Sequence, residues 1–399
     1  MKHETMRALG IILGGAILAI GAAMYFAPRA HAADLGGDCC SDLESRIAEL
    51  EATTARKGNR KVSLTVSGQI DAAYNWTSID GFDKGQITQN GNDESYIGIS
   101  GSAQVMQGWH VGYNLEIDLR QLGLLNAPVG GVDTSVRQSY WFIKSDQLGT
   151  FSMGRQAQAT QDFDKWSTNN AWIAGKPLSL GTLSDLYLTG IDLPFDGRYR
   201  DALKYESPTI AGFSLSASWG ASVDGNATDG TGNSYDVALR FANEAGGFKF
   251  AGAAGYRHDT DFTVNALGVT SITIPTGDVD TFLLMGSVKH FQTGLFVNVN
   301  YARQDWDDAH FNLDGIEATA GIERKFFALG QTSLFGTWGR YTLDPNAGQS
   351  GDLDYWGLGA VQSVDAAATD FYVGYRHYNS KDAIEADIDA VTAGAKVKF

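Results

Sequence analysis

Residues 389–399 read Asp-Ala-Val-Thr-Ala-Gly-Ala-Lys-Val-Lys-Phe, so apolar side chains alternate with polar or small ones as far as the final Phe399. Successive side chains of an extended chain point to opposite faces, and alternation therefore predicts a strand with one apolar and one polar face. Such a strand lies between an apolar phase and water.

The same alternation begins the strand-forming part of the chain. From Val62 to Trp76, apolar residues largely alternate with Ser, Thr, Gln, Asp and Asn. A tilted strand needs roughly 9 to 11 residues to cross a bilayer, so this stretch is long enough. If the first and last strands pair, the sheet closes into a barrel, and only a closed barrel leaves no unsatisfied strand edge in lipid.

Alternating stretches recur between these two ends, and short Gly-containing turns separate them in an up-and-down order. We predict sixteen strands, near residues 61–77, 94–106, 108–120, 135–146, 149–157, 200–208, 212–222, 234–244, 247–258, 280–291, 294–305, 314–327, 331–342, 353–363, 370–379 and 389–399. The strands near 135, 331 and 353 carry aromatic residues on both faces, as expected where a wall packs on another subunit or on an inward loop. The predicted fold is all-β, a sixteen-stranded antiparallel transmembrane β-barrel over residues 61–399 with a short N-terminal helical segment.

The N-terminus carries targeting information. Lys2 and Arg7 are followed by an apolar run that ends at Ala27, and Ala-His-Ala occupies residues 30–32. This order predicts a signal peptide over residues 1–32. The apolar run is longer than the roughly 7 to 15 residues typical of the apolar region of a signal peptide, so an uncleaved membrane anchor is the alternative.

Residues 33–60 are predicted to form a periplasmic helical segment and a basic linker. Ser41 and Glu44 make a capping box, and apolar residues follow at spacings of three and four. About two heptads are too few to establish a coiled coil. The alternatives for residues 41–55 are a solvated helix, a helix that joins subunits, and an arm that contacts the cell wall.

The composition argues against several functions. The net charge is −16, which disfavours nucleic acid as a partner. The 48 Gly, 20 Phe, 16 Tyr and 9 Trp suit tight turns and aromatic girdles. Cys39 and Cys40 are adjacent and lack the spacing of metal ligands, so we predict neither metal nor cofactor and expect an exposed pair that can oxidise between subunits.

One connection is far longer than the others. Residues 158–199 lack alternation although the two flanking strands should be neighbours. Apolar residues such as Phe163, Trp166 and Leu186 would let this segment fold against a wall, and we predict that it folds into the lumen. The loop carries Asp162, Asp164, Asp185, Asp192 and Asp196, and basic residues flank it at Arg155, Arg198, Arg200 and Lys204.

These charged residues are the candidate pore constriction. Arg198, Arg200 and Lys204 share one parity, opposite the apolar residues of their strand, so they should point into the lumen. Loop acids that face a basic wall would create a transverse field across a narrow aqueous slot, and the net negative charge favours cations. The alternative is that the loop acids are ordinary solvated charges.

Several motifs resemble those of general bacterial outer-membrane porins. Residues 137–141 (Arg-Gln-Ser-Tyr-Trp), 148–156 (Leu-Gly-Thr-Phe-Ser-Met-Gly-Arg-Gln) and 200–208 (Arg-Asp-Ala-Leu-Lys-Tyr-Glu-Ser-Pro) are similar to the motifs that bracket the inward-folded third loop of that family. The terminal Phe399 is similar to its outer-membrane assembly signal. The helical segment and the linker over residues 57–61 resemble alphaproteobacterial members.

The resemblance implies a homotrimer in the bacterial outer membrane whose water-filled channels let ions and small hydrophilic solutes diffuse passively. It also implies that Arg155 and Arg200 belong to a basic wall that faces the loop. An even number of strands behind a signal peptide would place both termini in the periplasm. The loop tip over residues 192–197, Asp-Leu-Pro-Phe-Asp-Gly, departs from the acidic-Phe-Gly-Gly tip of enterobacterial members, so the acids that line the constriction stay open.

Two alternatives remain beside a general diffusion channel. A substrate-specific channel is the nearer one, and a barrel hydrolase is the more distant. His258-Asp259 and Asp307-Asp308-Ala309-His310 lie at predicted junctions of strand and loop, where such an enzyme would carry acid and His groups. No Ser-centred nucleophile motif and no phosphate-binding Gly loop is present, and we predict that the chain is not an enzyme.

Overall fold

The computed structural model describes residues 62–79, 81–88, 93, 95–119, 136–163, 165–174, 199–220, 232–265, 273–307, 311–345, 351–381 and 386–399. Residues 56–399 belong to one compact unit. The predictions for the signal peptide, for Cys39 and Cys40 and for the helix over residues 41–55 lie outside the described residues.

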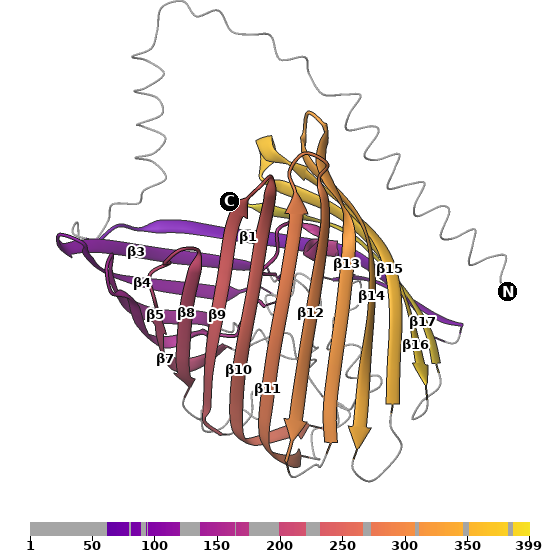
Figure 1. Cartoon of the computed structure of the whole chain (residues 1–399), viewed down its shortest axis with the longest axis horizontal. Coiled ribbons are helices and arrows are strands. Elements are labelled where there is room, and N and C mark those ends of the chain that lie inside the picture. The colour runs from indigo at the N-terminus through magenta and orange to yellow at the C-terminus, as the bar shows by residue number, and fades with distance from the viewer. Residues whose placement is uncertain are drawn as a thin grey trace, which may run out of the picture. The chain divides into compact units, whose positions relative to one another are not determined.

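The described residues are almost all in strands (Figure 1). The strands are β1 (Thr65–Ile79), β2 (Phe82–Thr88), β3 (Tyr96–Met106), β4 (Trp109–Asp118), β5 (Val136–Ser145), β6 (Gly149–Ala157), β7 (Tyr199–Glu206), β8 (Phe213–Gly220), β9 (Ser234–Ala245), β10 (Phe248–Asn265), β11 (Thr273–His290), β12 (Leu295–Trp306), β13 (Phe311–Phe327), β14 (Gly330–Pro345), β15 (Gly351–Val364), β16 (Thr369–Lys381) and β17 (Ala386–Lys398). Two short 3₁₀ helices, η1 (Ala171–Ala174) and η4 (Asp365–Ala367), complete them. Within the described ranges, no helix is both long and apolar enough to cross a membrane.

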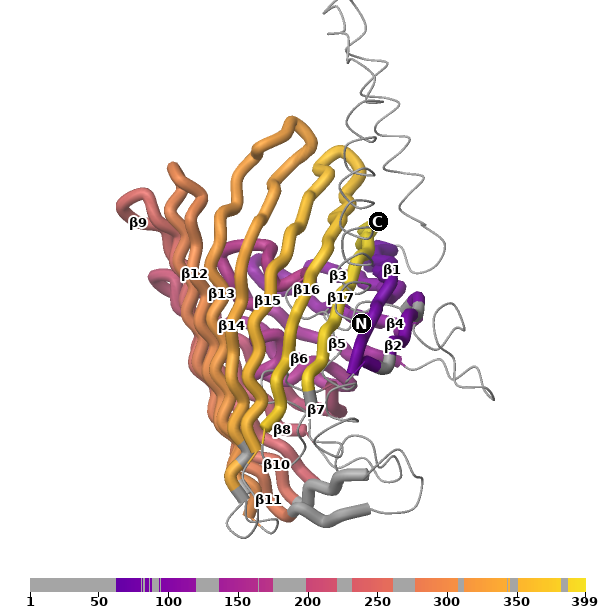
Figure 2. Tube along the Cα trace, turned by 90° about the vertical axis from the view of Figure 1, so that its right-hand side faces the viewer, coloured from indigo at the N-terminus to yellow at the C-terminus, as the bar shows by residue number. Residues whose placement is uncertain are grey.

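The first and last strands join and close the sheet. β1 pairs with β17 from Gln69 opposite Lys398 to Ile79 opposite Ile388. Along its other edge, β1 pairs with β3 from Thr65 to Gln69. The remaining strands of the ring pair antiparallel with their sequence neighbours. β2 pairs only with β1, so the other sixteen strands form the ring (Figure 2). The predicted sixteen-stranded antiparallel barrel is confirmed.

Alternation distinguishes the two faces of the wall. On β8, Phe213, Leu215 and Trp219 are 47, 45 and 48 % exposed, whereas Ser216 and Ser218 between them are buried. The buried row faces the inside of the ring, where loop residues cover it. The exposed apolar row is therefore the outer face, and an apolar outer face is what contact with lipid requires.

Short turns join the strands at one end of the barrel. Gly108, Gly149, Gly247 and Gly294 have φ values of 74, 90, 83 and 74°. This left-handed region favours glycine, which has no Cβ to clash with the preceding carbonyl. These are the turns that the sequence predicted.

Two features at the opposite end differ from the predicted strands. β2 pairs with β1 across a turn at Gly81, and β10 and β11 extend as far as Asn265 opposite Thr273. The register between β10 and β11 shifts after Asp259. After a bulge, odd and even positions exchange faces, so the apolar residues no longer follow the earlier alternation. A strand prediction based on strict alternation therefore assigns these residues to loops.

Inward-facing apolar residues of β14 and β15 pack on the long loop, whereas outward-facing aromatic residues such as Trp338 and Trp356 are exposed. Phe335 of β14 and Val361 of β15 point inward and are buried against Ile173 and Ala174 of η1. Of the two causes expected from the sequence, an inward loop is the one that the structure shows for these strands.

Candidate functional site

The described part of the long connection, residues 158–163 and 165–174, follows the inner face of the wall. Its hydrogen bonds reach one strand after another: Ala159 N–H to Ser218 Oγ of β8 (3.4 Å), Thr160 N–H to Asp236 Oδ2 of β9 (2.6 Å), Thr168 N–H to Ser287 Oγ of β11 (2.9 Å), Asn169 Nδ2–H to Asn298 Oδ1 of β12 (2.8 Å) and Asn170 N–H to Glu323 Oε2 of β13 (2.8 Å). This part of the loop therefore lies inside the ring and narrows it from that side.

Two charged residues of β9 hold the beginning of the loop. Asp236 accepts hydrogen bonds from both the backbone N–H and the hydroxyl of Thr160, at 2.6 and 2.8 Å. The Arg240 guanidinium donates to the carbonyl oxygens of Ala159 and Gln161, at 2.7 and 3.1 Å. Its Cζ also lies 5.1 Å from the centre of the Phe163 ring. Hydrogen bonds to charged groups are stronger than neutral ones, so these contacts fix where the loop enters the lumen.

Glu323 of β13 holds the loop further along. Its carboxylate accepts from the Asn170 N–H at 2.8 Å and from the Ser333 hydroxyl at 2.6 Å, and it forms an ion pair with Lys289. Glu323 is buried, and burying a carboxylate without hydrogen-bond partners is unfavourable, so these three partners offset the cost of its burial. The loop backbone supplies one of them.

The loop then crosses the seam where the barrel closes. Lys396 of β17 is fully buried, and its Nζ lies 4.6 Å from the centre of the Trp172 ring of η1. The same Nζ lies 2.8 Å from Asp93 Oδ2. Lys396 is paired in register with Asp71 of β1, whose carboxylate accepts a hydrogen bond from Tyr372. The closing strands and the internal loop therefore share one buried charged cluster.

Asp162 is the predicted loop acid that falls among the described residues. Its backbone is left-handed, with φ 59°, and its carboxylate lies 2.9 Å from Lys165 Nζ. Burial raises the pKa of Asp162, but the charge and hydrogen bond of Lys165 outweigh burial and hold the pKa below its usual value. The resulting stabilisation is present above the ordinary Asp pKa of about 3.9 and is lost as the pH falls through the lowered value. The predicted residues Asp164, Asp185, Asp192, Asp196 and Arg198 lie outside the described residues.

The predicted bases lie in three different environments. Arg200 is buried on the inner face, where it donates to the Gly232 carbonyl at 2.9 Å and pairs with Asp259 at 3.3 Å. Lys204 also lies on the inner face. Arg155 shares its parity with Phe151 and Met153, which are 41 and 47 % exposed on the outer face, and it donates to the Val136 carbonyl. The inward orientation expected for Arg155 therefore does not hold.

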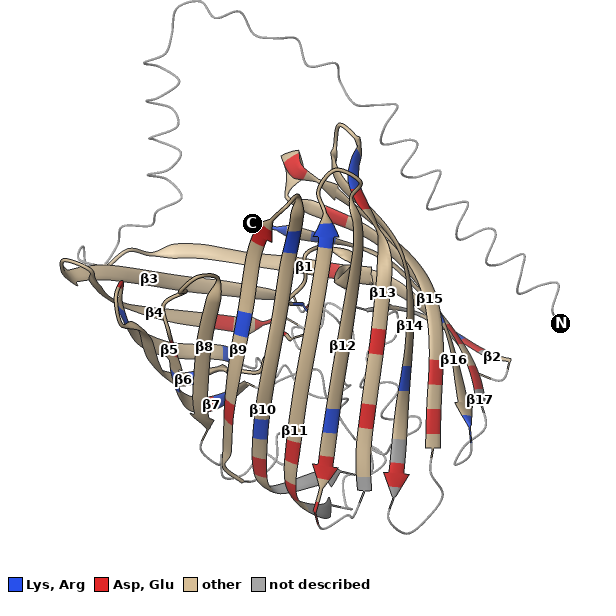
Figure 3. Ribbon diagram, viewed as in Figure 1, with Lys and Arg blue, Asp and Glu red and all other residues tan. Residues whose placement is uncertain are grey.

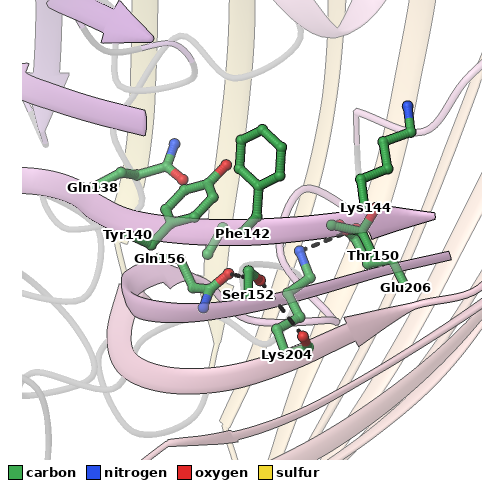
Figure 4. A pocket seen from close by; sticks show the side chains of 10 residues that line it. Gln138, Tyr140, Phe142, Lys144, Thr150, Ser152, Gln156, Lys204 and Glu206 are labelled. Carbon is green, nitrogen blue, oxygen red and sulfur yellow. Dashed lines mark hydrogen bonds and ion pairs between the residues drawn. The ribbon is translucent and has the colours of Figure 1, made fainter. Parts of the chain in front are cut away.

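A cavity of about 220 Å³ opens on the inner face of β5, β6 and β7 (Figure 4). Its lining consists of Gln138, Tyr140, Phe142, Lys144, Thr150, Ser152, Gln156, Ala157, Lys204 and Glu206. Lys204 Nζ lies 3.2 Å from Glu206 Oε1, and the Ser152 hydroxyl donates to Gln156 Oε1 at 2.6 Å. Lys144 and Gln156 were missed by the sequence analysis, although their parity on β5 and β6 matches that of the polar inner row.

The wall beside this cavity carries a second charged group. Arg137 donates to the Tyr199 hydroxyl at 2.9 Å and pairs with Glu116 of β4 at 3.8 Å. Gln138 donates to the same carboxylate at 2.6 Å. The described inner wall thus carries charges of both signs, as do the strands drawn in Figure 3.

The residues considered for catalysis do not assemble as the sequence suggested. His258 Nδ1 lies 2.7 Å from Asp280, on the outer face, whereas its neighbour Asp259 points inward to Arg200 and Arg257. His310 lies outside the described residues. Among the side chains that the structure describes, no group of three or more His, Cys, Asp or Glu residues could hold a metal ion.

The chain is similar in fold to several solved structures. The chain is similar to OmpT of Vibrio cholerae (17 % identity, TM-score 0.56, covering 87 % of this chain and 99 % of that one). It is similar to an anion-selective porin from Comamonas acidovorans (13 %, 0.60, 85 and 100 %) and to Salmonella typhi OmpF in complex with daunomycin (15 %, 0.58, 86 and 99 %). These identities support the fold alone.

The sequence itself supports more than the fold. No curated protein matches the chain. A family model described as Gram-negative porin matches residues 18–396. Because this match spans nearly the whole barrel and its internal loop, the chain belongs to the Gram-negative porin family of outer-membrane channels.

Proposed function

We propose that this porin is a water-filled channel for the passive diffusion of ions and small hydrophilic solutes. The observation that carries the proposal is the asymmetric lining of the ring. Loop residues 158–163 and 165–174 cover the inner face from β8 to β17, whereas the inner face of β4 to β7 presents polar side chains and a cavity. An aqueous slot between the loop and this wall follows from that division.

The constriction of the proposed channel lies between the loop and the wall of β4 to β7. Asp162 and Lys165 bound it on the loop, and Glu116, Arg137 and Lys204 bound it on the wall. The charge of Arg137 contributes to the lowered pKa of Asp162, so these two groups interact electrostatically. The constriction proposed from the sequence is thereby revised, with Arg137 in the place given to Arg155.

We also propose a homotrimer with both termini in the periplasm. The trimer form of the similar OmpT barrel supports the assembly, and the even number of strands in the ring supports the common side of the termini. Within this proposal, residues 41–55 join the subunits or contact the cell wall.

Recording in planar bilayers with a salt gradient tests the proposal. The wild-type protein should give stepwise conductance, because an aqueous slot passes ions. Arg137→Gln should change the cation-to-anion permeability ratio by about twofold in favour of cations, since the charges nearest the slot decide selectivity. Arg155→Gln is the matched control and should leave the ratio unchanged, because Arg155 lies on the outer face. Equal shifts in both variants, or folded protein without conductance, would contradict the proposal.

A further inference from the structure

The cavity on β5, β6 and β7 is built as rows of side chains across three neighbouring strands. Register places Lys144, Thr150 and Glu206 in one row, and Phe142, Ser152 and Lys204 in the next. In the following row Tyr140 carries the one large side chain, because Gly154 and Ala202 beside it have none or only a methyl group. The cavity therefore lies over small side chains, with Lys144 and Lys204 on one side and Ser152 and Gln156 on the other (Figure 4).

The charges around the cavity do not cancel. Glu206 is the only acid among its lining residues, and it pairs with Lys204 at 3.2 Å. Lys144 is exposed and makes no ion pair or hydrogen bond among the residues that the structure describes. One ammonium group is therefore left over, although the chain as a whole carries a net charge of −16. The charge nearest a site, and not the total, determines what binds there.

The polar side of the cavity is rigid. Ser152 donates to Gln156 Oε1 at 2.6 Å, and Gln156 Nε2 donates to the Ala202 carbonyl at 2.9 Å. Both side chains are buried, so their orientation is fixed before a solute arrives. Because the Ser152 hydroxyl hydrogen is already donated to Gln156, the Thr150 hydroxyl is the donor that this side of the cavity offers to a solute. A wall whose side chains are already fixed loses little conformational entropy when a ligand binds.

We propose that this cavity is a transit site for small carboxylate anions. Lys144 and Lys204 attract the carboxylate, the Thr150 hydroxyl donates to it, and the ring of Phe142 contacts the carbon skeleton. A volume of 220 Å³ has room for about seven waters, or for a dicarboxylate of four carbons. The side chains are partly open to water, so binding is weak, as passage requires. The inference rests on the proposed channel function and names its substrate class.

Block of the single-channel current by succinate tests the inference. Millimolar succinate, added to wild-type channels in potassium chloride, should reduce the chloride current with a saturable dose dependence. Lys144→Gln combined with Lys204→Gln should raise the half-blocking concentration by roughly tenfold, because two attractive charges are removed. Lys325→Gln, a change at an exposed lysine paired with Asp365 beside a turn, is the matched control and should behave as wild type. Succinamide, which is neutral and of similar size, should not block.

Each other outcome has a separate meaning. Equal block in the double variant and the wild type would overturn the site, and the absence of block in conducting wild-type channels would do so without any variant. Block by phosphate but not by succinate would overturn the carboxylate assignment. Block by succinamide would show a size effect and overturn the role of charge. Folded protein without conductance would instead refute the proposed channel.

Discussion

Removing the internal loop should raise the conductance of the channel on the order of twofold, because a sixteen-stranded ring without an insert leaves a wide aqueous lumen. Ala157 and Tyr199 are paired across β6 and β7, so a short Gly-Ser turn can replace residues 160–197. The inner residues that the loop covers include Asp236, Ser287, Asn298 and Glu323, which water can solvate. Single-channel recording measures the change.

A matched deletion controls for shortening a connection as such. Replacing residues 266–272, which join β10 to β11, with the same Gly-Ser turn should leave the conductance near the wild-type value. Heat-dependent migration on gels verifies that both deletions fold. An unchanged or smaller conductance in the folded variant without the internal loop would show that residues 158–174 do not limit the channel.

Lys396→Met should destabilise the barrel by about 3 to 5 kcal/mol, the cost of removing one partner of a buried ion pair. The substitution keeps the length of the side chain but leaves Asp93 without its ammonium partner at 2.8 Å. It also removes the cation beside the Trp172 ring and opposite Asp71 at the seam. The loss therefore affects closure of the sheet and docking of the loop together. Urea unfolding in detergent, followed by tryptophan fluorescence, measures the free energy.

Lys398→Met is the control two residues away on the same strand. Lys398 is half exposed, and its Nζ lies 3.7 Å from Asp370, so its loss should cost less than about 1 kcal/mol. Equal destabilisation by the two substitutions would show that burial of Lys396 contributes nothing specific. If Lys396→Met strongly lowers the free energy of unfolding but leaves the conductance unchanged, the loop is still docked. Lys396 would then stabilise closure of the sheet and not docking of the loop.

Alternation in the sequence predicts the strands and the faces of their side chains, because both depend on neighbouring residues alone. The β8 row of Phe213, Leu215 and Trp219 is an example. Where a bulge interrupts the register, as after Asp259, the same rule fails. β2 was missed for a related reason: its pairing with β1 depends on a turn at Gly81 within a polar segment.

The candidate site was less accessible to sequence reasoning, because it depends on partners far apart in the chain. The alternation of β6 places Arg155 beside Phe151 and Met153, and the resemblance to porins alone suggested that it points inward. Arg200 does lie inside, but its partner Asp259 is on β10 and cannot be identified from one sequence. Lys144 on β5 could not be assigned to the inner face, because aromatic residues on both faces of this strand obscure its alternation.

Swelling of liposomes that contain the purified protein tests the central claim most directly, that water and small hydrophilic solutes share one passive route. In isotonic solutions of uncharged sugars of increasing size, the swelling rate should fall smoothly with the size of the sugar and rise in proportion to its concentration. No swelling with the smallest sugar, or a rate that saturates for one solute and is absent for others of equal size, would contradict the account.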